Sequence, residues 1–279
     1  MYDHAAIVNC VQKIKAQLPK TFDDKPLGLI LGTGLSDIAG DLETTILPFK
    51  DLPHFPYTPN PAQAGLLQAG FLGAIPCIAL VGRVHIYEGF SAQEVCFGVR
   101  VLKHLGVETL IVTNCAGALN PKYNTPCLFL AYDQINFTGQ SPLMGPNDDS
   151  LGPRFPDLTQ AFDKTLIHVT RETALELGIP LELGVYIGVH GPELETPAET
   201  RLYRSFGADA IGMSSVLEVI CARHMGLKVL ELSCLANKNL PDCMQPITLE
   251  EVVANTQKLN GQLATLISHI APKIMASYS

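Results

Sequence analysis

Residues 91–120, SAQEVCFGVRVLKHLGVETLIVTNCAGALN, decide the class of fold, because a capped helix leads directly into an apolar strand. Ser91 and Glu94 have the spacing of a capping box, in which each side chain accepts a hydrogen bond from the other residue's backbone N–H, and the helix is expected to end at Gly106. Residues 109–113 have the continuous apolar character of a buried strand. The small residues that follow, 114–120, are expected to form a loop at the end of that strand.

The same alternation of strands and helices extends along the chain. Further strands are predicted at residues 27–31, twice within 65–82, and at 183–189, 210–212 and 229–233. Helices are predicted at residues 7–18, 159–177, 197–206 and 215–225, and after Thr248, which has capping-box spacing to Glu251. This alternation predicts an α/β fold, a single domain over residues 1–279 with a mixed, mainly parallel central sheet flanked by helices. Ligands of such sheets bind at the carboxyl ends of the strands.

The composition excludes several classes of protein. Hydrophobic residues make up 47% and charged residues 16% of the 279 residues, so the chain can bury a large core and is not intrinsically disordered. The net charge of −8 and the lack of a basic cluster argue against a nucleic-acid partner. The longest uncharged apolar run, residues 65–82, contains glutamine, proline and four glycines, so no membrane association is expected.

Eight cysteines are scattered along the chain without a C-x-x-C pair, and the histidines share no metal-ligand spacing. We therefore expect reduced, buried thiols and no metal site. The first residues of the sequence also lack the basic-then-apolar pattern of a secretory signal. These features together predict a cytoplasmic protein.

Two loops near the amino-terminal strands carry residues suited to an anion. In GTGL, residues 32–35, glycines allow close backbone approach and the Thr33 hydroxyl can donate a hydrogen bond, although a simple tight turn explains this segment equally well. In GRVHIYEG, residues 82–89, an extended backbone would place Arg83, His85 and Tyr87 on one face. A guanidinium, an imidazole and a phenol on one face are suited to an oxyanion beside a hydroxylated group.

Four further loops carry candidate binding groups at strand ends. The amides of residues 114–118 are suited to a flat or anionic ligand, and Cys115 is interpreted as a packing residue because no base partner is identified for a nucleophile. Glu195 precedes the predicted N-cap Thr196 and faces whatever that loop binds. Ser214 lies at a helix N-terminus that favours an anion, and Asn237 can both donate to and accept from the edge of a heterocycle.

The order of these motifs closely resembles that of the trimeric purine nucleoside phosphorylases over nearly the whole chain. The resemblance is carried by LILGTGL (29–35), GRVHIYEG (82–89), VTNCAGALN (112–120), GPELETPAE (191–199), GADAIGMSS (207–215) and LANK (235–238). It implies a nucleoside phosphorylase-like fold. It also implies a reaction in which a purine nucleoside and inorganic phosphate, the co-substrate, become free base and (deoxy)ribose 1-phosphate. No further cofactor is implied.

The resemblance implies a role for each matching residue. Phosphate would be bound by Thr33, Gln63, Arg83, His85, the amide of Cys115 and Ser214. The nucleoside would be contacted by Tyr87, Ala116, Gly117, Leu194, Glu195, Met213, Asn237 and Leu249. The catalytic residues would be His85, Glu195 and Asn237, a set that favours 6-oxopurine nucleosides such as inosine and guanosine. Phe155 would reach into the site of a neighbouring subunit, which implies a homotrimer.

Several positions depart from the family pattern, among them Thr33 for serine, Leu194 for phenylalanine and Ala236 for threonine, and two further departures leave alternatives open. Gln63 stands where the family usually has a histidine, and Leu249 replaces the histidine near the ribose 5′-hydroxyl. An apolar Leu249 would also suit the methylthio group of a 5′-methylthionucleoside, so a phosphorylase of such nucleosides is one alternative. A degenerate member that binds nucleosides without cleaving them is the other. Gln63 weakly favours it, whereas the polar residues retained in the other motifs argue against it.

Overall fold

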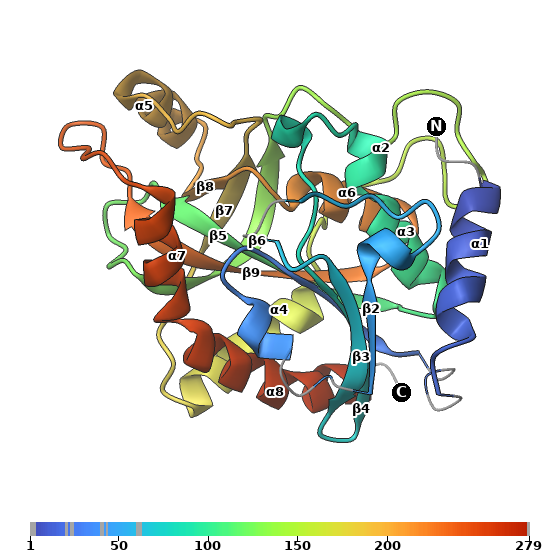
Figure 1. Ribbon diagram of the computed structural model, residues 1–279. Helices are drawn as coiled ribbons and strands as arrows, with labels where there is room; N and C mark the ends of the chain where they lie inside the picture. Colours follow the sequence, from blue (N-terminus) through green and yellow to red (C-terminus); the bar gives the residue numbers. More distant parts are fainter. Residues whose placement is uncertain are drawn as a thin grey trace.

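The computed structural model describes residues 4–19, 22, 25–39, 42, 44–59 and 63–277, and within these ranges the strands form one nine-stranded sheet (Figure 1). The strands are β1 (Leu27–Leu31), β2 (Thr45–Pro48), β3 (Leu66–Leu72), β4 (Ile75–Val81), β5 (Thr109–Ala118), β6 (Cys127–Asn136), β7 (Leu181–Gly188), β8 (Ala210–Gly212) and β9 (Lys228–Lys238). Their order is β2-β3-β4-β1-β5-β8-β7-β6-β9, and β9 also pairs with β5, so β5 to β9 close into a ring. Five of the nine pairings among the described strands are parallel, which confirms the predicted mixed, mainly parallel sheet.

Helices cover both faces of this sheet (Figure 1). They are α1 (His4–Lys15), α2 (Ala92–Val95), α3 (Phe97–His104), α4 (Lys164–Glu176), α5 (Pro197–Ser205), α6 (Val216–His224), α7 (Leu249–Gln257) and α8 (Asn260–Ala276). Helices α1, α3 and α6 pack on one face, α4 and α8 pack on the other, and α7 packs against β9. Short 3₁₀ helices lie at Ser36–Ala39, Phe49–Asp51 and Ile86–Glu88.

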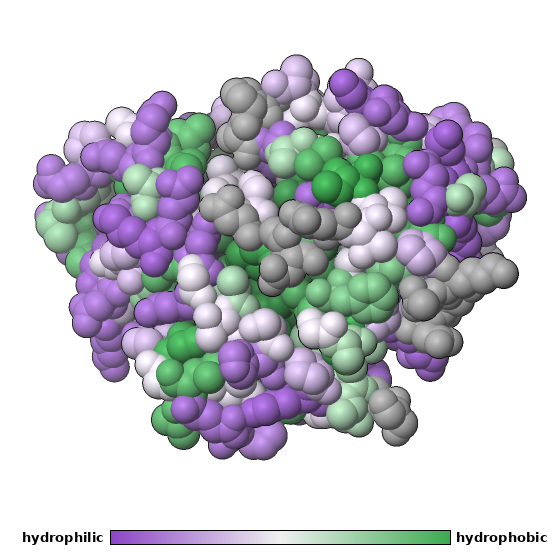
Figure 2. All heavy atoms as spheres, turned by 60° about the horizontal axis from the view of Figure 1, so that its bottom comes forward, coloured by the Kyte–Doolittle hydropathy of each residue, from purple (hydrophilic) through white to green (hydrophobic). Residues whose placement is uncertain are grey.

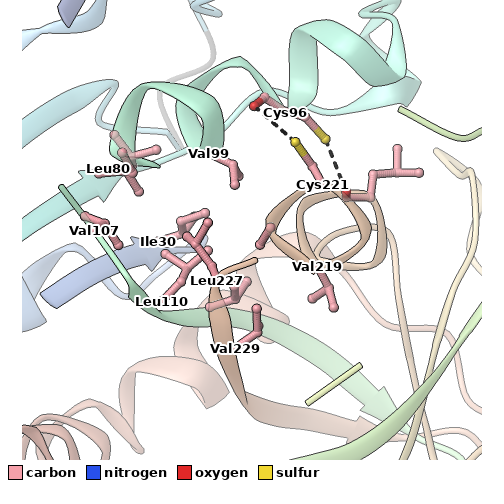
Figure 3. Packing of buried hydrophobic residues seen from close by; sticks show 14 of the residues in the cluster. Ile30, Leu80, Cys96, Val99, Val107, Leu110, Val219, Cys221, Leu227 and Val229 are labelled. Atoms are coloured by element: carbon pink, nitrogen blue, oxygen red, sulfur yellow. Dashed lines mark hydrogen bonds between the residues drawn. The ribbon is translucent and has the colours of Figure 1, made fainter. Parts of the chain in front are cut away.

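Alternating side chains along the strands build two separate cores. In β5, Leu110 and Val112 belong to the cluster beside α1, α3 and α6, whereas Ile111 belongs to the cluster beside α4 and α8. Figure 3 shows the first cluster, where Val99 of α3 and Val219 of α6 pack with residues of the central strands. Because both faces of β5 are covered, the strand is apolar on both, which is the pattern that identified it in the sequence.

The distribution of side chains on the surface and the free state of the cysteines agree with the expectations from the composition. Hydrophilic side chains occupy much of the margin of the face in Figure 2, and hydrophobic side chains gather toward its middle. In the described part of the chain, no helix is both long and apolar enough to span a membrane. The cysteines are free thiols, and Cys96 and Cys221 lie together between α3 and α6 (Figure 3), where the Cys96 thiol donates to the Leu217 carbonyl oxygen at 3.2 Å.

The predicted capping boxes are present, but several element bounds differ from the prediction. Those at Ser91, Thr196 and Thr248 form with the expected partner residues. Helix α4 begins at Lys164 instead of near residue 159, because the Asp163 carboxylate accepts two backbone N–H bonds and caps the helix there. The helix expected over residues 91–106 is divided into α2 and α3, and the helix after Thr248 is divided into α7 and α8.

The sequence did not predict strands β2 and β6. The first half of β6 is buried, but its second half, from Tyr132 to Asn136, is exposed or half-buried and largely polar. It therefore lacks the long apolar run by which the other strands were recognised. Strand β6 is nevertheless essential to the architecture, because it closes the ring by pairing with β7 on one side and β9 on the other.

Candidate active site

The predicted site residues lie in two clusters that strand β5 connects. The first cluster surrounds Arg83, and the second contains Glu195 and Asn237. The Thr113 carbonyl oxygen accepts from Arg83, and Gly117 lies against Asn237, so residues along β5 reach both clusters. Ala116, between them, is 6% exposed.

A buried ion pair organises the first cluster. Arg83 Nε and Nη2 donate to the two carboxylate oxygens of Glu218 at 3.0 and 3.1 Å, and Nη1 donates to the Thr113 carbonyl oxygen at 2.8 Å. Each terminal nitrogen has a second hydrogen, so the guanidinium can still donate to an anion. The sequence analysis did not single out Glu218. Its one signal is a carboxylate within the otherwise apolar start of α6.

Gln63 joins the loop after β1 to the Arg83 segment. Its Nε2 donates to Thr33 Oγ1 at 2.8 Å, and its Oε1 accepts from the Arg83 backbone N–H at 2.9 Å. The Thr33 hydroxyl accepts this bond and keeps its own hydrogen for a ligand. Gly32 is required here, because a Cβ at this position would lie 2.9 Å from Arg83 Nη1. An amide at position 63 thus has a structural role as a two-sided bridge.

His85 is held from two sides. Its Nε2 lies 3.2 Å from Ser214 Oγ, and its ring stacks on Tyr87 with centroids 4.7 Å apart. Glu88 accepts from the His85 backbone N–H at 2.9 Å. Burial acts to raise the pKa of Glu88, but hydrogen bonds from His85 and Thr58 outweigh it and the pKa is lowered. The lowered pKa favours the ionised form of Glu88, whose carboxylate holds His85 through its backbone N–H.

The expectation of one extended face for Arg83, His85 and Tyr87 is wrong. Residues Ile86–Glu88 form a 3₁₀ helix, which breaks the alternation of side chains along a strand. His85 and Tyr87 still meet, through ring stacking, whereas the guanidinium of Arg83 is directed to Glu218 on α6.

An amide that the sequence analysis missed joins the residues of the second cluster. Asn239 Nδ2 donates to Glu195 Oε2 at 2.9 Å, and Asn237 Nδ2 donates to Asn239 Oδ1 at 2.5 Å. Burial raises the pKa of Glu195 and the charge of Glu199 adds to the rise, while a backbone hydrogen bond opposes it. The LANK motif ends one residue before Asn239, so no quoted motif included it.

Three predicted substrate-binding residues are not packed into the site within a single chain. Leu194, Leu249 and Phe155 are 55%, 58% and 86% exposed. Met213, in contrast, lies against Gly191, where a Cβ would come within 2.3 Å of its sulfur. Asn237 also borders a cavity of about 480 Å³ between the end of β9 and α7.

A buried polar network adjoins the first cluster. Asn114 Nδ2 donates to Ser215 Oγ at 2.6 Å and to Glu231 Oε1 at 2.9 Å. Ser215 has a φ of 58°, an unfavourable backbone conformation for serine, and it directly follows Ser214. Burial raises the pKa of Glu231 to about 8, although the hydrogen bond from Asn114 and the charge of Arg83 act to lower it. The network therefore places beside Ser215 a carboxyl group whose burial favours its neutral form.

Residues 26–272 match the family model of the phosphorylase superfamily. The fold is similar to the crystal structure of isoform 2 of purine nucleoside phosphorylase from Schistosoma mansoni in complex with cytosine and ribose-1-phosphate. The TM-score is 0.91, the identity is 34%, and the match covers 96% of both chains. These matches confirm the predicted nucleoside phosphorylase-like class of fold.

Relatives in sequence identify the family within this class of fold. Purine nucleoside phosphorylase 1 of Bacillus subtilis is 44% identical over 92% of this chain and 94% of its own length. Purine nucleoside phosphorylase 1 of Geobacillus stearothermophilus is 41% identical over 96% of this chain and 97% of its own length, and the purine nucleoside phosphorylase of Rattus norvegicus is 40% identical over 90% and 91%. The chain belongs to the purine nucleoside phosphorylases, and the resemblance indicated by the sequence motifs is confirmed.

The raised pKa of Glu231 predicts a pH-dependent stability. Between its unfolded pKa of about 4.3 and its folded pKa of about 8, the folded chain retains a proton that the unfolded chain has lost. Glu231 therefore lowers the free energy of unfolding by up to about 1.4 kcal/mol for each pH unit of rise within this window. We expect Glu231→Gln, which stays neutral, to gain stability relative to the wild type from pH 5 to pH 8, measured by urea unfolding. Parallel pH profiles for the two proteins would contradict this.

Proposed function

We propose that this purine nucleoside phosphorylase cleaves the N-glycosidic bond of 6-oxopurine (deoxy)nucleosides, such as inosine and guanosine, with inorganic phosphate. The products are the free base and (deoxy)ribose 1-phosphate. The observation that carries the proposal is the pair of clusters on β5, because the donors around Arg83 suit phosphate and the Glu195–Asn239–Asn237 chain suits a purine edge. The reaction needs no resident cofactor, because phosphate supplies the nucleophile.

The first cluster accounts for phosphate binding and attack. A phosphate oxygen attacks C1′ of the sugar while the C1′–N9 bond breaks and its electron pair passes to the purine. Positive charge develops on the sugar, and the bound dianion stabilises it. In the proposed complex, phosphate accepts hydrogen bonds from Arg83, His85, the hydroxyls of Thr33 and Ser214, and the amide of Cys115. Their positions are fixed before phosphate arrives, so little reorganisation is required.

The second cluster accounts for the choice of base. Glu195 accepts a hydrogen bond from N1–H of a 6-oxopurine, and Asn237 donates to O6. As the base departs, its N7 takes a proton from water, and Asn237 accepts from that N7–H. Ala116 and Gly117 line the face of the ring. Adenosine has no hydrogen on N1 and carries a 6-amino group, so these partners are mismatched. An unpaired buried polar group costs about 1–3 kcal/mol, which corresponds to a discrimination of roughly ten- to a hundredfold.

In the proposed complex, fewer polar groups contact the sugar than contact the phosphate or the base. Tyr87 stacks on His85 and Met213 directly precedes Ser214, and both contact the ribose in the proposed complex. Leu249, the first residue of α7, has no group that can pair with the 5′-hydroxyl. The protein is therefore expected to tolerate the loss of that hydroxyl, a tolerance that would extend to 5′-modified nucleosides.

A substrate panel tests this proposal. We expect hypoxanthine release from inosine only when phosphate is present, and a kcat/KM for adenosine at least about tenfold lower. The kcat/KM for 5′-deoxyinosine should stay within about threefold of inosine, because no hydrogen-bond partner is lost. Free base is measured by chromatography in reactions with and without phosphate.

Each arm of the panel can fail separately. Binding of inosine without any phosphate-dependent release would identify a non-catalytic nucleoside-binding protein. Equal kcat/KM for adenosine and inosine would overturn the base assignment. A large penalty for 5′-deoxyinosine would show that another residue pairs with the 5′-hydroxyl.

We also propose that the active assembly is a homotrimer in which Phe155 completes a neighbouring site. The Phe155 side chain is 86% exposed, and the Arg154 guanidinium lies 5.6 Å from the centre of its ring. Burying an aromatic side chain of this size against a partner stabilises the assembly.

We propose that the protein is cytoplasmic, because its free, mostly buried thiols are typical of a reducing environment.

Subunit complementation tests the shared site. Light scattering should give three times the 30.1 kDa chain mass, and Phe155→Ala should raise the KM for inosine by about tenfold. In trimers co-assembled from Phe155→Ala and Arg83→Ala chains, sites with an intact Arg83 can receive Phe155 from a neighbour. These mixed trimers should therefore recover the wild-type KM. A fully active monomer, or mixed trimers without recovery, would contradict the shared site.

A further inference from the structure

Asn239 lies between the two side chains proposed to bind the base. It follows β9 directly, it is 8% exposed, and its backbone N–H donates to the Ala118 carbonyl oxygen at 2.8 Å, which anchors it to the end of β5. Its side chain bonds to Glu195 at 2.9 Å and to Asn237 at 2.5 Å. Gly117 leaves room for this arrangement, because a Cβ there would lie 2.9 Å from Asn239 Nδ2.

Glu195 determines which group donates in both hydrogen bonds of the series Glu195–Asn239–Asn237. An ionised carboxylate only accepts hydrogen bonds, so Asn239 must turn its Nδ2 toward Glu195. Its Oδ1 then faces Asn237 and can only accept, so Asn237 must turn its Nδ2 toward Asn239. Asn237 is left with a free Oδ1 and one remaining Nδ2 hydrogen.

We propose that Asn239 is a positioning residue that determines base specificity by fixing the orientation of the Asn237 amide. The inference deepens the proposed function and rests on it. The fixed orientation presents a hydrogen to O6 of a 6-oxopurine, and it presents an oxygen to N7, which carries a hydrogen once the departing base has taken a proton from water. An amide rotated by 180° would instead present its oxygen to position 6, where it can accept from the 6-amino group of adenosine. Asn239 opposes that rotation, because it would place the Asn237 oxygen against the Asn239 oxygen. Rotating Asn239 as well would only move the conflict, since its oxygen would then face the Glu195 carboxylate.

The inosine-to-adenosine ratio of kcat/KM tests the inference. Asn239→Leu removes both hydrogen bonds at similar side-chain volume, and Asn239→Ser leaves a side chain too short to bridge both partners. With the Asn237 amide free to rotate, we expect the ratio to narrow by about tenfold in both variants. The KM for phosphate should not change, since the first cluster is untouched. The serine variant carries the test if the leucine variant does not fold.

Asn255→Leu is the matched control. Asn255 Nδ2 donates to the Ala236 carbonyl oxygen at 3.0 Å, so the same substitution removes an asparagine bond to the same strand without touching Glu195 or Asn237. We expect a lower thermal midpoint and an unchanged ratio in this variant.

Two results would overturn the inference. One is a wild-type ratio in folded Asn239→Leu and Asn239→Ser, and the other is equal narrowing in Asn255→Leu, which would show general loosening of the site. Failure of the proposed function is a separate outcome, because it appears in the wild type as no phosphate-dependent cleavage of inosine.

Discussion

The buried ion pair between Arg83 and Glu218 is the constraint on which the rest of the site depends. Their side chains are 4% and 3% exposed. Taking two such charges out of water costs several kcal/mol per ion, and only a bidentate, well-bonded contact offsets that cost. The pair joins the segment after β4 to α6, and the bond to Thr113 joins both to β5. Three separate parts of the chain must therefore meet correctly before the Arg83 cation is in place for the phosphate that we propose it binds.

Strand β5 connects the cluster around Arg83 to the cluster that contains Glu195 and Asn237. Gly117 pairs with Ile211 of β8 on one side and with Asn237 of β9 on the other, and the register between β5 and β9 shifts between Ala116 and Gly117. Because these pairings are backbone bonds within a closed ring of strands, the two clusters keep a fixed separation. A fixed separation matters chemically, since the sugar must span the attacking phosphate and the departing base.

The parts of the structure that depend on local pattern were predictable, and those that depend on distant pairing were not. Strands β1 and β5 and the three capping boxes were identified from apolar runs and from spacing. Strand β6 was not predicted because the second half of it is largely polar. Glu218 and Asn239 were missed for a different reason. Glu218 pairs with Arg83, 135 residues away in the sequence, and Asn239 pairs with Glu195, 44 residues away. A local sequence pattern carries no information about contacts at such separations.

The central claim is that the ion pair presents Arg83 to phosphate, and a double variant tests it most directly. Arg83→Met combined with Glu218→Gln leaves no unpaired buried charge, so the fold can be kept while the cation is removed. We expect kcat/KM for phosphate, at saturating inosine, to fall in this variant by an amount equivalent to about 2–3 kcal/mol. Hypoxanthine binding, measured by calorimetry, should stay the same. An unchanged kcat/KM for phosphate, with hypoxanthine still bound normally, would contradict the account.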